Sequence, residues 1–210
     1  RTGSEKKIKP PTHINGSKVY RKEGEVALYC DDPHVFERRV QAVAYAVSRQ
    51  ALDIDGLGIK TIEQLLERGM ITTFADLYGL TRDELLELDG FKDLSADNLI
   101  AAIADASCVD LQRFITALGI KHVGGETALR LAQVFRSLDS LMRASKEDLL
   151  AVDDVGEVVA ESIVVFFAAE QSRQLIATFL SHGGRIREVE AQRVGALSGQ
   201  TFVLTGTLKQ

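Results

Sequence analysis

The sequence predicts a mainly α-helical protein in which one short helical unit is repeated four times. Four hairpin-like triplets recur along the chain, and their last residues are 34, 32 and 32 positions apart (92 − 58, 124 − 92 and 156 − 124). A fixed period in this range is typical of repeated supersecondary units. The chain has no Trp and only 6% aromatic residues, a composition that favours small, closely packed helices over a β-sandwich.

Each repeat contains a triplet, a small or apolar residue four positions later and an apolar-periodic segment, which is the pattern of a helix-hairpin-helix motif. The triplets, called hairpins 1 to 4, are Gly56-Leu57-Gly58, Gly90-Phe91-Lys92, His122-Val123-Gly124 and Asp154-Val155-Gly156. The residues four positions further on are Ile62, Ala96, Ala128 and Ala160. We therefore assign the four motifs to residues 50–184.

Ahead of the repeats, residues 1–17 read as an extended arm or linker because they lack periodicity and contain Pro10-Pro11. The segment 18–49 is predicted to form a small β-hairpin around a turn at 22–25, followed by a helix at 34–49. Within the repeats, helices are expected at 61–68, from Thr72, at 95–106, 110–118, 126–135, 137–144, 158–167 and 172–182. Capping-box patterns predict helix starts at Thr81 and Ser145.

After Gly183-Gly184 the character of the chain changes. Residues 185–198 read as a linker, with a charged segment or short strand at 185–193. Residues 199–210 contain a β-rich run, and a single strand cannot satisfy its own ladder hydrogen bonds. We expect this run to open a further domain.

Composition restricts the classes of function. The 210 residues are 45% hydrophobic and 26% charged, no apolar run is long enough for a bilayer, and two cysteines make no disulfide framework. We therefore expect a cytoplasmic protein without a membrane partner. The net charge of −5 argues against a basic binding surface over the whole molecule, although residues 1–22 carry +6 and the remainder −11 (−5 − 6). Phosphate contacts made by backbone N–H groups need no formal charge.

Hairpins 1, 2 and 3 are the candidate phosphate-binding sites. Glycine permits positive φ and close approach of the backbone to a ligand, and the N–H groups and dipole of the following helix favour an anion. Two such hairpins can hold both strands of a duplex and read its backbone rather than its bases. The candidate residues are Gly56, Gly58, Lys60, Thr61, Gly90, Lys92, Lys121, His122, Gly124 and Gly125.

The hairpins are not equivalent in sequence. Lys92 replaces a glycine in hairpin 2, which adds charge but is expected to distort the turn. Hairpin 4 carries Asp153, Asp154 and Glu157 around Gly156, so we expect it to be a poor phosphate site. The alternative for all four is that they are only helix-packing turns.

Metal binding has weaker support. His122 has no evident catalytic partner, and the pairs Asp31-Asp32 and Asp153-Asp154 follow no metal-ligand spacing. A set made of His13, Cys30 and His34 fits no standard zinc finger. We predict no metal site.

The chain resembles the C-terminal half of bacterial NAD-dependent DNA ligases over essentially its whole length. The segments that carry the resemblance are 1–12, 23–30, 48–58, 95–99, 117–124, 158–163 and 201–208. In that family an oligonucleotide-binding barrel is followed by a four-cysteine zinc finger, four helix-hairpin-helix motifs and a BRCT domain. By this resemblance, 18–49 is a degenerate finger and 199–210 begins the α/β BRCT domain, which would be truncated here.

The resemblance places Thr12, Asn15, Cys30 and Val35 at the four zinc-ligand positions, so three ligands are missing and zinc binding is expected to be lost. It implies nick sealing by a parent enzyme that uses NAD and magnesium. The adenylated lysine belongs to an N-terminal region, so we expect no catalytic residue and no cofactor here.

The implied partners are nicked double-stranded DNA, the rest of the ligase chain, and repair or replication proteins bound through the BRCT region. Two other interpretations remain open. One is a helical scaffold that binds proteins and not DNA, and the other is an accessory domain of a repair nuclease. The finger remnant and the run at 201–208 argue against the nuclease.

Overall fold

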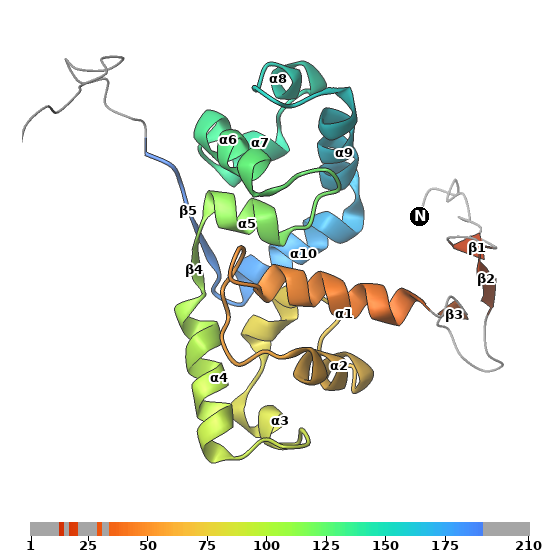
Figure 1. Ribbon diagram of the computed structural model, residues 1–210, viewed down its shortest axis with the longest axis vertical. Helices are drawn as coiled ribbons and strands as arrows, with labels where there is room; N and C mark the ends of the chain where they lie inside the picture. Colours follow the sequence, from red (N-terminus) through yellow and green to blue (C-terminus); the bar gives the residue numbers. More distant parts are fainter. Residues whose placement is uncertain (1–12, 15–16, 21–28, 31–33, 191–210) are drawn as a thin grey trace, which may run out of the picture.

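The computed structural model describes residues 13–14, 17–20, 29–30 and 34–190, and it confirms the mainly helical fold (Figure 1). The helices are α1 (His34–Val47), α2 (Ile59–Glu67), the 3-10 helix η1 (Phe74–Gly79), α3 (Arg82–Leu86), α4 (Asp93–Asp105), α5 (Leu111–Ala117), α6 (Gly125–Phe135), α7 (Leu138–Met142), α8 (Lys146–Leu150), α9 (Glu157–Ala168) and α10 (Glu170–Ser181). The strands are β1 (His13–Ile14), β2 (Ser17–Tyr20), β3 (Tyr29–Cys30), β4 (Cys108–Asp110) and β5 (Arg185–Arg187).

The N-terminal strands contain the predicted β-hairpin and one strand more. Strand β2 pairs antiparallel with β3, with Val19 opposite Cys30. Strand β1 pairs antiparallel with β2, with His13 opposite Lys18. The extended arm predicted over 1–17 thus includes a short paired strand, β1, near its end.

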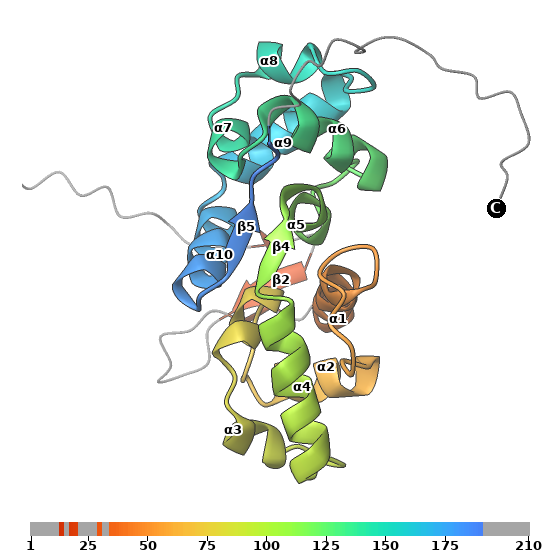
Figure 2. The ribbon, with the colours of Figure 1, turned by 90° about the vertical axis from the view of Figure 1, so that its left-hand side faces the viewer.

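The helices form two halves that are stacked along the long axis of the molecule (Figure 1). Helices α1 to α4 and η1 make one half, α6 to α9 make the other, and α5 and α10 lie between them. Strands β4 and β5 run side by side in both views and pair in parallel, with Val109 opposite Ile186 (Figure 2). This pair ties the connection between the halves to the segment that follows α10.

The predicted capping boxes are confirmed, and they explain where two short helices begin. The Thr81 hydroxyl accepts from the Glu84 N–H at 3.4 Å, and the Glu84 carboxylate accepts from the Thr81 N–H at 2.7 Å. Ser145 and Asp148 make the same exchange at 3.1 and 3.0 Å. Each box satisfies two backbone donors that the first turn leaves unpaired.

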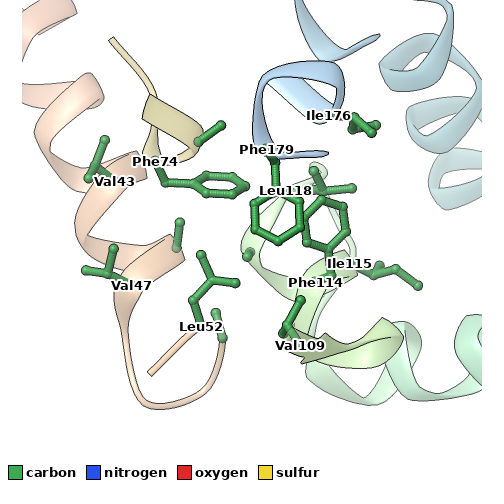
Figure 3. Close-up of a cluster of buried hydrophobic side chains, with 14 of the residues drawn as sticks. Val43, Val47, Leu52, Phe74, Val109, Phe114, Ile115, Leu118, Ile176 and Phe179 are labelled. Carbon is green, nitrogen blue, oxygen red and sulfur yellow. The ribbon is translucent and has the colours of Figure 1, made fainter. Parts of the chain in front are cut away.

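The hydrophobic core is continuous between the halves, and its centre is aromatic (Figure 3). Phe114 of α5 lies 4.8 Å from Phe179 of α10 and 6.3 Å from Phe74 of η1, measured between ring centroids. Tyr78 meets Phe179 edge-to-face at 4.9 Å. A Cβ at Gly184 would lie 2.5 Å from the Phe179 ring, so the stop after α10 requires glycine. Helix α10 thus joins both halves.

Helices α9 and α10 meet at Ala169, whose backbone is extended at φ −70° and ψ 134°. The two axes are bent by 67°. Within the described ranges, no single helix is long and apolar enough to cross a membrane, and only this bent pair passes such a test of length and composition.

Asp76 supplies a testable contribution to stability. Its carboxylate accepts from the N–H groups of Thr72 and Thr73 at 2.9 and 2.8 Å and from both hydroxyls at 2.8 and 3.1 Å. Burial alone would raise its pKa, but these hydrogen bonds outweigh burial and hold the pKa below its usual value. Stability from a depressed carboxyl pKa is present at neutral pH and is lost as the pH falls below about 4.

Asp76→Ala is therefore expected to reduce the free energy of unfolding by about 1 kcal/mol at pH 7 and by less at pH 3. Urea unfolding at both pH values measures the difference. Asp105→Ala, at the exposed end of α4, is the control and should change stability by less than about 0.5 kcal/mol. An Asp76→Ala effect that is independent of pH would contradict this role.

Candidate nucleic-acid interface

The four hairpins share one backbone conformation although their sequences differ. The first residue of each triplet has positive φ: Gly56 at 86°, Gly90 at 87°, His122 at 66° and Asp154 at 63°. This left-handed region favours glycine and, among other residues, Asn, Asp and His. In hairpins 2, 3 and 4 the middle residue donates its N–H to the carbonyl three residues earlier at 3.0 to 3.2 Å. The four turns therefore share a left-handed first residue, and hairpins 2, 3 and 4 share the same hydrogen bond as well.

The third residue of each triplet precedes a helix in extended backbone. Gly58 has φ −76°, Lys92 −138°, Gly124 −91° and Gly156 −89°. The expectation that Lys92 distorts its turn is wrong, because any residue adopts this conformation. Positive φ does not explain the glycines at this position either. A Cβ at Gly58, Gly124 or Gly156 would meet no atom within 4 Å, so glycine leaves open space in front of the helix.

The small or apolar residue four positions after each triplet anchors the helix. Ile62, Ala96, Ala128 and Ala160 are fully buried. Each donates its N–H to the carbonyl of the hairpin's last residue, at 3.1, 2.9, 2.8 and 2.9 Å respectively. This position thus fixes the first turn against the core and aims the helix N-terminus at the hairpin.

The helices after hairpins 1, 3 and 4 differ from their neighbours in how they begin. No side-chain hydrogen bond caps α2, α6 or α9. At α4 the Ser95 hydroxyl accepts from the Lys92 N–H at 2.8 Å in a capping box, and Thr81, Ser137 and Ser145 cap α3, α7 and α8. Helices α5 and α10 also lack such a bond, so the distinguishing feature is an uncapped helix joined to an open glycine hairpin. First-turn N–H groups of this kind are donors for an external anion.

Charge divides the hairpins into two classes. The four equivalent 16-residue windows are 48–63, 82–97, 114–129 and 146–161. Their net charges are −1 (two bases, three acids), −4 (two and six), 0 (one and one) and −5 (one and six). Hairpins 1 and 3 are nearly neutral, whereas hairpins 2 and 4 stand in strongly acidic segments. The surroundings of hairpins 1 and 3 are therefore better suited to a phosphate.

The acidic hairpins carry matching ion-pair clusters. Arg82 contacts Asp93, the first residue of α4, and Asp97 at 2.6 Å. Sixty-four residues later (146 − 82), Lys146 contacts Glu157, the first residue of α9, at 2.8 Å and Glu161 at 3.2 Å. Hydrogen bonds to Glu157 and Glu161 raise the pKa of Lys146. A carboxylate thus occupies the first position of α4 and of α9, whereas α2 has no acid in its first turn and α6 has Glu126 as its second residue.

Long side chains hold the hairpins in position. Gln64 of α2 donates to the Asp89 carbonyl at 3.3 Å and accepts from the Asp89 N–H at 2.8 Å, just ahead of hairpin 2. Arg130, at the equivalent position of α6 (130 − 64 = 66), contacts Asp154 of hairpin 4 at 2.7 Å. Arg113 of α5 donates to the Ala51 carbonyl at 2.6 Å, ahead of hairpin 1. None of these three contacts was predicted, because each joins residues that are far apart in the sequence. Only an alignment of the repeats shows that Gln64 and Arg130 are equivalent.

The structure distributes the predicted site residues over three hairpins. Lys60 and Thr61 lie in the first turn of α2, Gly125 begins α6, and Lys121 precedes His122 in the turn. A hollow of about 670 Å³ at hairpin 1 is lined by Gly56 and Gly58 together with Ser48 and Arg49, which were not predicted. A second hollow of about 360 Å³ is lined by Gly56 and by Phe91 of hairpin 2, so hairpins 1 and 2 lie side by side.

Among the residues that the structure describes, no group of three His, Cys, Asp or Glu side chains is placed to hold a metal ion. Of the four positions that correspond to zinc ligands, Cys30 lies in β3 and Val35 in the first turn of α1. Thr12 and Asn15 lie outside the described residues. So do Asp31-Asp32 and the run at 199–210 that was assigned to a BRCT domain.

Two family models match the chain, and they define its class. A SAM-like helix-hairpin-helix tandem matches residues 48–105, which hold hairpins 1 and 2. A helix-hairpin-helix motif matches residues 113–176, which hold hairpins 3 and 4. The chain therefore carries tandem helix-hairpin-helix motifs in these two segments.

Curated relatives match the chain over essentially its whole length. It is 42% identical over 217 residues to a DNA ligase of Bacillus cytotoxicus, covering 100% of this chain and 32% of the relative. It is 40% identical to a DNA ligase of Anoxybacillus flavithermus with the same coverage, and 43% identical to one of Trichlorobacter lovleyi over 99% of this chain and 31% of the relative. The resemblance to bacterial DNA ligases is confirmed, and the chain spans about a third of their length.

Proposed function

We propose that this chain is the DNA-binding part of an NAD-dependent DNA ligase and that hairpins 1 and 3 hold the phosphate backbone of nicked duplex DNA. The observation that carries the proposal is the pairing of an open glycine with an uncapped helix at Gly58 and at Gly124. Backbone N–H groups there can donate to a phosphate oxygen without a Cβ in the way. The name of the curated relatives supports the choice of a ligase.

The two hairpins sit at equivalent positions of the two halves. Their last residues are 66 positions apart (124 − 58). Five positions before the last residue, hairpins 1 and 3 each have a residue with left-handed backbone, Asp53 at φ 58° and Gly119 at φ 61°, and hairpins 2 and 4 do not. Two equivalent sites on one body suit the two backbones of a duplex. Lys60 and Lys121 add positive charge close to these sites.

Hairpin 2 contributes less in this proposal than the sequence suggested. Gly90 and Lys92 remain candidates, but the carboxylate of Asp93 occupies the start of α4 beside Arg82. A negative charge at that point opposes a phosphate. We assign Lys92 a long-range electrostatic role rather than a direct contact.

The remaining features of the parent protein are proposals that rest on the resemblance. They are the sealing of nicks with NAD and magnesium, a cytoplasmic location, roles in DNA repair and replication, loss of the zinc ion, and repair or replication partners bound through the BRCT region. The residues described here make no catalytic step in this proposal. They position DNA for chemistry performed elsewhere in the parent protein.

The test is binding of the full chain to a fluorescent nicked duplex at 50 and 200 mM salt. With two to four phosphates contacted, Kd should rise about 10- to 150-fold between the two salt concentrations. Two duplexes of unrelated sequence should bind within about twofold of each other. Absence of binding at 50 mM salt would overturn the proposal and favour the protein scaffold.

A further inference from the structure

The outward face of α9 carries two exposed valines where a surface helix is usually polar. At 100° per residue, Val158, Val165 and Glu161 point the same way, and the buried residues Ala160, Ile163 and Phe167 point the opposite way. Val158 is 63% exposed and Val165 58% exposed. These two valines and the adjacent carboxylates of Glu157 and Glu161 are called the α9 patch.

The repeat itself does not require these valines. Helix α4 occupies the equivalent place in the other half, 64 residues earlier (157 − 93). There Leu94 matches Val158 and is also exposed, whereas Ala101 matches Val165. The fold therefore tolerates a small residue at the second position. The second exposed valine is a property of α9 and not of the motif.

Charge indicates what kind of molecule fits the α9 patch. The segment 146–161 has one base and six acids, and Arg130, paired with Asp154, reduces its net charge only to −4 (−5 + 1). Lys146 is shared between Glu157 and Glu161. Such a surface repels a phosphate backbone and a second copy of itself, and it attracts a basic partner.

We propose that the α9 patch docks a basic amphipathic helix of a separate protein. Val158 and Val165 are seven residues apart, so they present an apolar stripe along about 10 Å of helix. A partner helix with aliphatic residues at the same spacing covers the stripe, and Lys or Arg residues on its flank meet Glu157 and Glu161. The proposal is independent of DNA binding by hairpins 1 and 3.

The test uses a labelled 18-residue synthetic peptide with a Leu stripe and Lys flanks, and a scrambled peptide of the same composition. The amphipathic peptide should bind the full chain at least tenfold more tightly than the scrambled one. V158S/V165S should weaken its binding about tenfold, and L94S/A101S on α4 should leave it within twofold. All four side chains are exposed, so the substitutions should leave the fold intact. Circular dichroism checks that each variant folds.

Two further measurements separate the possible occupants. Binding of nicked duplex DNA should be the same for V158S/V165S and the wild type, and sedimentation should show the same monomeric state for both. Weaker DNA binding by V158S/V165S would make hairpin 4 a DNA site and overturn the proposal. A wild-type dimer that V158S/V165S abolishes, or equal binding of the two peptides, would also overturn it.

Discussion

Replacing Gly58 and Gly124 together by valine is expected to lower the affinity for duplex DNA by about 100-fold. Each valine places a branched side chain in the open space before an uncapped helix. Loss of one charge-assisted hydrogen bond at each site, worth about 1.5 kcal/mol, corresponds to roughly tenfold per site. The backbone at both positions is extended, so the fold should survive with a helix-capping cost of about 1 kcal/mol.

Gly156→Val is the matched control, because Gly156 has nearly the same backbone as Gly124 and equally open surroundings. It should have a similar effect on stability and no effect on DNA binding, since hairpin 4 is acidic. Fluorescence anisotropy with a nicked duplex at 100 mM salt measures the double variant and the Gly156→Val control. If Gly156→Val weakened binding by the roughly tenfold expected per site for Gly58 and Gly124, charge would not be the feature that separates the hairpins.

The spacing of the hairpins was predictable because it depends on local sequence. Glycine, a buried small residue four positions later and capping boxes each act within one turn of helix, so Thr81, Ser145 and the repeat period could be read directly. The role of the glycine at the third position of a triplet could not be predicted from local sequence. Gly58 and Lys92 adopt similar extended backbone, and only the structure shows that the left-handed residue is the first one, including His122 and Asp154.

The features that join the two halves were not predictable from local patterns. Strands β4 and β5 have three residues each, which is too short to show the alternation of apolar and polar residues that predicts a strand. They are also 77 positions apart in the sequence (185 − 108). The Arg113 contact spans 62 residues. The likeness of the Arg82 and Lys146 clusters appears only when the halves are aligned with a shift of 64. Contacts of this kind depend on tertiary structure and leave no local pattern in the sequence.

Phe179→Ala is expected to reduce the free energy of unfolding by about 3–5 kcal/mol, the largest stability effect predicted for this chain. Phe179 is fully buried between Phe114 and Tyr78, and its ring lies against Gly184. Its removal leaves a cavity at the contact of α10 with α5 and η1, where both halves meet (Figure 3). Urea unfolding followed by circular dichroism measures the loss.

Leu180→Ala, one residue further along α10, is the control, because Leu180 is 49% exposed. It should cost less than about 1 kcal/mol. Because hairpins 1 and 3 belong to different halves, Phe179→Ala should also weaken DNA binding under conditions where the chain is still folded, although Phe179 is buried in the core. A stable Phe179→Ala variant would show that the halves are held together elsewhere, and unchanged DNA affinity would show that each hairpin acts alone.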